Sequence, residues 1–62
     1  MKIEAFLYDE NGAESVVVYN DIDIDTIVDD LCITCENWEY ASIYYEGGTC
    51  IAHPNGDYEF QD

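Results

Sequence analysis

Basic side chains are almost absent from this sequence, in which Lys2 is the only lysine and arginine does not occur. Fifteen aspartates and glutamates give the chain a formal net charge of −14 at pH 7. Proteins that bind nucleic acids or anionic membranes present lysine and arginine to phosphate groups. We therefore expect no direct binding to DNA, RNA or membranes, and a partner that itself has a basic surface.

Long apolar segments are also absent. No run approaches the roughly 20 apolar residues of a transmembrane helix. Acidic residues such as Glu4 and Asp9 interrupt the region where a signal peptide would be apolar. We therefore expect a cytoplasmic protein, because free thiols and zinc thiolates persist in that compartment. Disorder is not expected, because 48% of the residues are hydrophobic and 15% are aromatic.

The length of 62 residues suffices for one domain, residues 1–62, with a small core. A chain of this size buries only about 60% of its unfolded surface. Disulfides, a metal ion or oligomerisation usually stabilise such small domains. Self-repulsion of the net negative charge makes stabilisation more necessary. Three cysteines cannot all pair within one chain, so a disulfide framework would leave one thiol unpaired.

The first hairpin is predicted from two alternating segments, residues 2–8 and 14–20. Asn11-Gly12 is the strongest short hairpin signal, and a two-residue turn there sets Leu7 opposite Val16. One face of the hairpin would then be covered by a helix, and the other would be aromatic. The helix-covered face is predicted to hold Ile3, Ala5, Leu7, Val16 and Val18, and the other face Phe6, Tyr8, Val17 and Tyr19.

Helical spacing of apolar residues follows, from residue 25 to about residue 36, with Asn37 as a left-handed cap. Residues 39–46 and 49–52 then predict a second hairpin that turns at Gly47-Gly48, and residues 58–60 could add a last short strand. The expected fold is α+β, a ββαββ domain whose antiparallel sheet carries one helix on one face.

All three cysteines and the single histidine lie between residues 32 and 53. Cys32 and Cys35 form a C-x2-C pair and, after a gap of fourteen residues, Cys50 and His53 form a C-x2-H pair. This spacing predicts a Cys3His zinc site, and four protein ligands would make the zinc structural. The site requires the chain break before Pro54 to turn His53 back beside Cys50, because residues 50 and 53 of a straight strand face opposite sides.

Two other interpretations of these residues stay open. Cys32 and Cys35 could be buried apolar residues of a helix, with Cys50 in a strand core and His53 in a turn. Alternatively, Cys32 and Cys35 could form a disulfide. A redox-active pair is disfavoured, because activated thiolates occur at helix N-termini or beside positive charge, and this pair lies among acids at the end of the predicted helix.

Carboxylates concentrate in the middle of the chain, where seven acids lie between Asp21 and Glu39 and several aromatic residues lie nearby. A surface selected only for solubility would also be acidic, but lysines would balance part of its charge. Closely spaced carboxylates, with tyrosines that supply contact area, can occupy a groove lined by lysine and arginine. No Ser/His/Asp set is apparent, so we expect binding without enzymatic activity. The predicted contact residues are Asp21, Asp23, Asp25, Asp29, Asp30, Glu36, Glu39, Tyr44, Tyr45 and Glu46.

These features resemble the small acidic proteins that bacteriophages direct against host defences, some of which mimic DNA. In particular, the chain resembles anti-CRISPR inhibitors of Cas9, which are short, acidic, mixed α/β proteins. The resemblance covers the whole chain in size, charge and element order, and it rests on no shared motif. The Cys32, Cys35, Cys50 and His53 pattern would make this a metal-containing member. The resemblance implies stoichiometric binding in or beside the basic channel of Cas9 that holds guide and target, in the host bacterial cytoplasm.

Other partners fit the same features. Phage inhibitors of host RNA polymerase and proteins directed against restriction enzymes or nucleases are also small and acidic. An acidic adaptor would bind a basic partner without displacing nucleic acid. The aromatic face with Phe6, Tyr8 and Tyr19 could equally be the interface of a homodimer.

Overall fold

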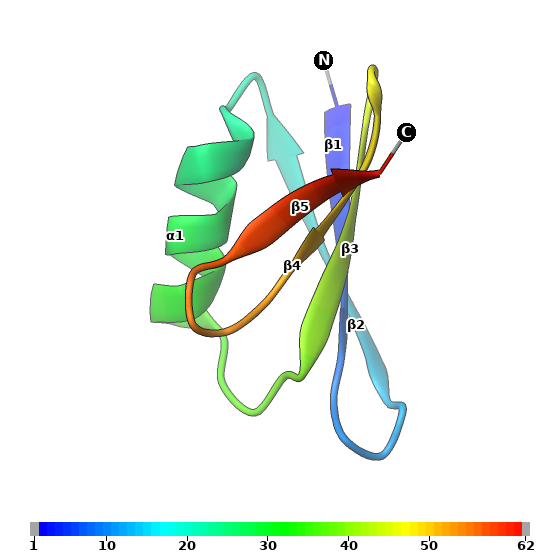
Figure 1. The fold of residues 1–62 in the computed structure, drawn as a ribbon, viewed down its shortest axis with the longest axis vertical. Helices are drawn as coiled ribbons and strands as arrows, with labels where there is room; N and C mark the ends of the chain where they lie inside the picture. Colours follow the sequence, from blue (N-terminus) through cyan, green and yellow to red (C-terminus); the bar gives the residue numbers. More distant parts are fainter. Residues whose placement is uncertain (1, 62) are drawn as a thin grey trace.

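The computed structural model describes residues 2–61, which form an antiparallel sheet with one helix packed on one of its faces (Figure 1). The strands lie side by side in the order β2-β1-β3-β4-β5. The α+β prediction is confirmed, but the chain order is ββαβββ, because the optional last strand is a full member of the sheet. The elements are β1 (Lys2–Tyr8), β2 (Glu14–Asn20), α1 (Ile24–Thr34), β3 (Tyr40–Tyr45), β4 (Gly48–Ala52) and β5 (Tyr58–Gln61).

The connection between β1 and β2 is longer than the predicted two-residue turn. Tyr8 pairs with Glu14, so all of residues 9–13 lie in the loop. The carboxylate of Asp9 accepts hydrogen bonds from two backbone N–H groups inside this loop, at 2.8 and 2.9 Å. Gly12 adopts a φ of 83°, as the Asn-Gly signal predicted, but it does so within the larger loop.

The longer loop shifts the register of β2 by one residue, and the predicted assignment of its faces is therefore wrong. Ala5 pairs with Val17 instead of Val18. A shift of one residue exchanges the two faces of a strand. Tyr19 is buried and Val17 packs against the core beneath the helix, whereas Val16 and Val18 are 49% and 48% exposed on the other face.

Helix α1 forms because three large apolar side chains recur on one of its sides. Ile27, Val28 and Leu31 are at most 1% exposed and pack onto the sheet. Burial of each such side chain contributes about 1.5–3 kcal/mol to folding. The N-cap residue, Asp23, makes no side-chain capping hydrogen bond, so packing outweighs capping as the cause of this helix.

The end of α1 differs from the prediction. The helix starts at Ile24 and its last helical residue is Thr34, where residues 25 to about 36 were predicted. Cys35 is the C-cap, has an extended backbone and donates its N–H to the carbonyl of Leu31 at 3.0 Å. Asn37 has the predicted left-handed conformation, with a φ of 64°, but it lies beyond the helix in the connection to β3.

Two tyrosines connect α1 to opposite edges of the sheet. The hydroxyl of Tyr19 in β2 donates to the carboxylate of Asp30 at 2.6 Å. The hydroxyl of Tyr58 in β5 donates to the carboxylate of Asp25 at 3.1 Å. Hydrogen bonds to an ionised carboxylate are about twice as strong as neutral ones. Two acids of α1 therefore have structural partners.

The β3–β4 turn also differs by one residue from its prediction. Tyr45 pairs with Gly48, so Glu46 and Gly47 form the turn, where Gly47-Gly48 was predicted. Between β4 and β5, the backbone N–H of His53 donates to the carbonyl of Asp57 at 2.8 Å and closes the connection.

The core lies between α1 and the helix-facing side of the sheet, and no polar or charged side chain among residues 2–61 is buried in it. The carboxylates of the described residues are therefore all at least partly accessible to solvent. The buried apolar residues are Ile3, Ala5, Leu7, Tyr19, Ile27, Val28, Leu31, Trp38, Ala41, Ile43, Cys50 and Ala52.

Candidate functional site

The predicted zinc ligands occupy three different environments. Cys50 points from β4 into the core and is 0% exposed. Burial raises the pKa of its thiol, which opposes formation of the thiolate that binds metal. Cys32 and Cys35 are partly buried at the end of α1. His53 lies in the connection after β4 and is also partly buried.

The two cysteines of the C-x2-C pair diverge. The thiol of Cys32 donates to the backbone carbonyl of Pro54 at 3.3 Å, on the β4–β5 side of the helix. Cys35 lies at the other side, where it lines a hollow together with Leu7 and Ser15. Its sulfur is 3.7 Å from the hydroxyl oxygen of Thr34.

No three His, Cys, Asp or Glu side chains within residues 2–61 are grouped so that they could hold a metal ion. The four predicted ligands all lie in this range, and the structure does not bring them together. The arrangement of Cys32, Cys35 and Cys50 agrees instead with the interpretation as separate, mostly apolar side chains. Structural zinc stays a prediction, and the geometry gives it no support.

Five of the eight acids predicted to contact a partner lie at two ends of the molecule, and the other three lie on α1. Asp21 and Asp23 lie in the β2–α1 connection and Glu46 lies in the β3–β4 turn, at the upper end in Figure 1. Glu36 and Glu39 lie in the α1–β3 connection at the opposite end. The predicted contact acids are therefore spread over both ends of the molecule and α1.

The acids of α1 differ in their availability. Asp29 is exposed, whereas Asp30 is partly buried beneath the hydroxyl of Tyr19. Asp25 is exposed but is bound to the hydroxyl of Tyr58. Asp29 is therefore the better candidate for contact with a partner.

The two tyrosines predicted as neighbouring contact residues point to opposite faces of the sheet. Tyr45 faces the helix side, where its ring meets that of Phe60 edge-on at a centroid distance of 5.9 Å. Tyr44 is 47% exposed on the uncovered side. Only Tyr44 is placed for an external contact on that side.

The uncovered side of the sheet, here called the open face, is rich in apolar and aromatic side chains. Tyr44 meets Phe6 edge-on with ring centroids 5.4 Å apart, and Tyr40 stacks on Tyr8 at 4.9 Å. Tyr40 is 41% exposed, in addition to the half-exposed valines of β2. The strand alternation places the following on the open face: Phe6, Tyr8, Val16, Val18, Tyr40, Ser42, Tyr44, Thr49 and Ile51.

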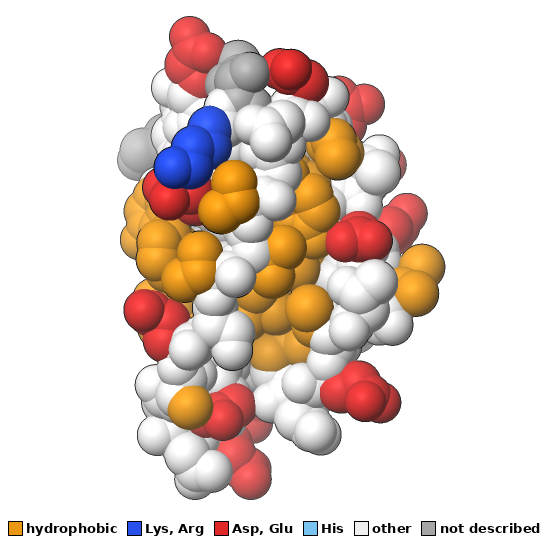
Figure 2. Space-filling view, turned by 180° about the vertical axis from the view of Figure 1, so that it is seen from behind, with side chains coloured by type: hydrophobic (Ala, Val, Ile, Leu, Met, Phe, Trp, Pro, Cys, Tyr) orange, Lys and Arg blue, Asp and Glu red, His pale blue; other side chains and the backbone are white. Residues whose placement is uncertain are grey.

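Charged residues border this open face. Glu4 and Glu14 share it by strand alternation, as does Glu59 beside Ile51. The Nζ of Lys2 lies 3.8 Å from the Oε2 of Glu4. Exposed ion pairs of this kind contribute only about 0–1 kcal/mol to stability. A hydrogen bond with Glu14 raises the pKa of Tyr8 and keeps its hydroxyl protonated. Figure 2 views the molecule from behind Figure 1, toward the β2 edge of the sheet, and shows hydrophobic side chains in the middle of that view with acidic side chains around them.

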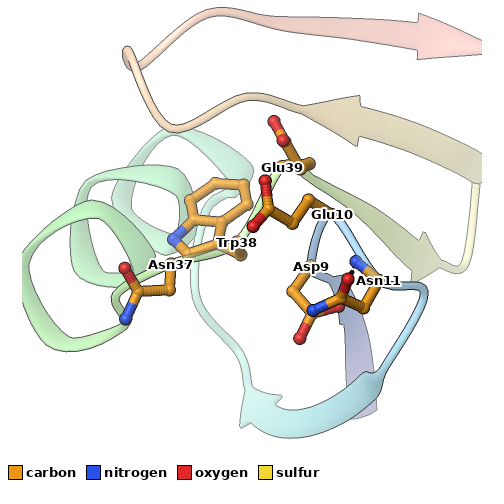
Figure 3. Close-up of a pocket in the computed structure, with 6 residues that line it drawn as sticks. All are labelled: Asp9, Glu10, Asn11, Asn37, Trp38 and Glu39. Atoms are coloured by element: carbon orange, nitrogen blue, oxygen red, sulfur yellow. Dashed lines mark hydrogen bonds between the residues drawn. The ribbon is translucent and has the colours of Figure 1, made fainter.

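A hollow of about 370 Å³ lies where the β1–β2 loop meets the segment before β3. Trp38, only 7% exposed, forms part of its wall. Figure 3 shows the carboxylates of Glu10 and Glu39 on one side of the indole. Sequence reasoning missed this group because Asp9 and Glu10 were assigned only to a turn. The lining residues are Asp9, Glu10, Asn11, Asn37, Trp38 and Glu39.

Comparison of the chain with protein-family models, curated protein sequences and solved structures finds no match. Within the part of the chain that the structure describes, α1 is too short and too polar to cross a membrane.

Proposed function

We propose that this protein acts by binding, without turnover, to a basic protein surface that otherwise holds nucleic acid. One observation carries the proposal: a net charge of −14 is combined with an aromatic open face that no other element of residues 2–61 covers. Protein interfaces commonly have an apolar centre with aromatic residues and a polar rim. The open face has this composition.

The charge selects the class of partner. Nucleic acids and anionic membranes would be repelled, whereas a surface lined with lysine and arginine would attract the protein over distances of about 8–10 Å at moderate salt. Long-range attraction of this kind raises the association rate, and close contacts of aromatic side chains then lengthen the lifetime of the complex. The carboxylates would increase the rate of association, and the contacts of the open face would slow dissociation.

The proposed partner is Cas9, as the resemblance to anti-CRISPR proteins implies, with the basic channel for guide and target as the binding surface. Host RNA polymerase and restriction enzymes also bind nucleic acid on basic surfaces, so they are the alternative partners. In each case the proposed contact residues are Tyr40, Tyr44, Val16 and Val18, with Asp29 and the acids of the two ends as the surrounding charge.

Displacement of a labelled DNA duplex from guide-loaded Cas9 tests the proposal directly. We expect stoichiometric displacement that weakens as the salt concentration rises. Tyr44→Ser should weaken binding roughly ten-fold, the usual effect of removing a central aromatic contact. Ile33→Ser is the matched control, because Ile33 is 81% exposed on α1 and lies away from the open face. It should bind as the unmodified protein does.

Three outcomes would argue against parts of the proposal. Binding that leaves DNA in place would indicate an adaptor. Displacement from RNA polymerase or a restriction enzyme, but not from Cas9, would change the partner and keep the mode of action. Equal effects of Tyr44→Ser and Ile33→Ser would exclude the open face as the contact surface.

A further inference from the structure

Strand β2 is an unprotected edge of the sheet. It pairs with β1 on one side, and no strand of residues 2–61 pairs with it on the other. All seven of its residues, Glu14–Asn20, pair with β1 in an unbroken register, without a bulge. The strand contains no proline and no lysine, which are the usual devices that prevent one edge from pairing with another. An unbroken edge strand of this length is a template for a further strand.

We propose that a second copy of this chain occupies this edge, through antiparallel pairing of β2 with β2 about a two-fold axis at Val17. Val17 is the midpoint of the strand, so a register centred there pairs all seven residues. This inference concerns a different partner from the proposed function, and the backbone edge of β2 carries it; the two surfaces share Val16 and Val18.

The sequence of β2 is complementary to itself in this register. Glu14, the only charged residue of the strand, comes to lie opposite Asn20 of the other copy. Val16 lies opposite Val18 of the other copy, and Val17 lies opposite its own equivalent. No carboxylate of the strand faces another carboxylate. Parallel pairing in register would instead place the two Glu14 side chains beside each other, and like charges directly opposite are destabilising.

The exposure of two valines of β2 also favours a second copy of the chain as the partner. Val16 and Val18 are 49% and 48% exposed, and the paired arrangement would cover them with each other on the open face. Pairs of β-branched side chains across neighbouring strands stabilise a sheet. The other edge strand, β5, is a poorer candidate, because it has only four residues, Tyr58–Gln61, and one of them is Glu59.

The dimer should be weak and salt-dependent. One seven-residue strand is a much smaller contact than the roughly 20–30 residues per side of a standard stable interface. Each copy also has a net charge of −14, and this repulsion opposes association at low ionic strength. A two-fold contact uses up the β2 edge of both copies, so assembly through this edge stops at a closed pair.

Sedimentation velocity of the unmodified protein over a range of protein and salt concentrations gives the first test. We expect a reversible monomer–dimer equilibrium in which dimer increases with both concentrations. A protein that stays monomeric at high salt and at the highest soluble concentration would overturn the proposal. This measurement needs no variant and therefore does not depend on the folding of one.

Mixtures of charge variants test the register. In the proposed pairing, a V16E chain mixed with a V18K chain has a carboxylate directly opposite an ammonium group. A V16E chain mixed with a V16K chain has the same total charge, but the two groups are diagonal neighbours. We expect the first mixture to associate roughly two- to five-fold more tightly than the second. Equal association, or stronger association of the second mixture, would overturn the register centred on Val17.

Discussion

The three cysteine side chains differ in their access to solvent. Cys50 is fully buried in β4, whereas Cys32 and Cys35 are partly exposed at the end of α1. Access governs the reaction of thiols, because only an accessible thiolate attacks a reagent. The rate at which each thiol reacts with a reagent therefore reports whether that cysteine is buried or accessible.

We expect a thiol-specific reagent to modify Cys32 and Cys35 in the native, metal-free protein, while Cys50 reacts only at the rate of unfolding. Burial and the raised pKa of Cys50 both slow its reaction. Cys50→Ala should abolish the slow phase and leave the other two reactions unchanged. Zinc held by Cys32, Cys35, Cys50 and His53 would protect all three thiols, so release of three reactive thiols by a chelator would establish the predicted site and contradict the arrangement described above.

Tyr19 is the residue for which pH should matter most. Burial, and then the hydrogen bond to Asp30, raise the pKa of its hydroxyl well above the usual value of about 10. Below pH 10 the hydroxyl keeps its proton in both the folded and the unfolded chain. Above that pH the unfolded chain releases the proton first, so the free energy of unfolding falls as the pH rises toward the pKa of the folded state.

Urea unfolding at a series of alkaline pH values, followed by the fluorescence of Trp38, measures this effect. We expect Tyr19→Phe to cost about 1–3 kcal/mol at neutral pH, because Asp30 loses its donor, and to flatten the decline in stability above pH 10. Tyr44→Phe removes a hydroxyl from the open face and serves as the control. An unchanged alkaline slope in Tyr19→Phe would show that another group causes the decline.

Among the elements, β1 to β4 and α1 could be predicted from apolar spacing and turn residues, whereas β5 was predicted only as a possible addition. The register of β2 could not, because Asn11-Gly12 fits both a two-residue turn and a longer loop, and the two loops place opposite faces of the strand inward. The carboxylate of Asp9 decides between them by accepting two backbone hydrogen bonds. Local turn residues indicate a hairpin but do not give its loop length.

This loop gives a prediction about stability. Asp9→Ala leaves two backbone N–H groups without their acceptor and should lower the free energy of unfolding by about 1–2 kcal/mol. Asp9→Asn keeps one acceptor oxygen and should restore most of this loss. Glu10→Ala, in the same loop and exposed, should change stability by less than about 0.5 kcal/mol. Chemical denaturation of the three variants measures the differences, and equal losses in Asp9→Ala and Glu10→Ala would exclude this role of Asp9.

The candidate site was less predictable than the fold. Consecutive residues of a strand point to opposite faces of the sheet. Tyr44 and Tyr45, which were predicted as neighbouring contacts, therefore lie on different faces. Acids close in the sequence came to lie at two ends of the molecule, because a helix intervenes between them. The open face could have been found from its aromatic residues on β1 and β3, but its valines required the correct register.

On the scale of the whole molecule, charge and size act against each other. The chain has a net charge of −14, and its Cα radius of gyration is only 10.5 Å for residues 2–61. Compact packing of like charges costs free energy that the unfolded chain avoids. Lys2 can offset little of this cost.

We therefore expect sodium chloride to stabilise the fold. Screening should raise the melting temperature by roughly 4–8 °C for each 1 kcal/mol of repulsion that is removed. Asp29→Asn should stabilise at low salt and have a smaller effect at high salt, since it removes one exposed charge from α1. Thermal melts followed by circular dichroism measure both effects. A melting temperature that is constant or falls with salt would show that charge repulsion does not limit stability.

The two tyrosine hydrogen bonds to α1 have a consequence for how the molecule fluctuates. Edge strands usually fray independently and exchange their amide hydrogens quickly. Here β2 and β5, at opposite edges, are both fastened to the same helix by Tyr19–Asp30 and Tyr58–Asp25. Detachment of the helix would break the hydrogen bonds to both edge strands at once. Amide exchange in β2, β5 and α1 should therefore occur with a common opening free energy.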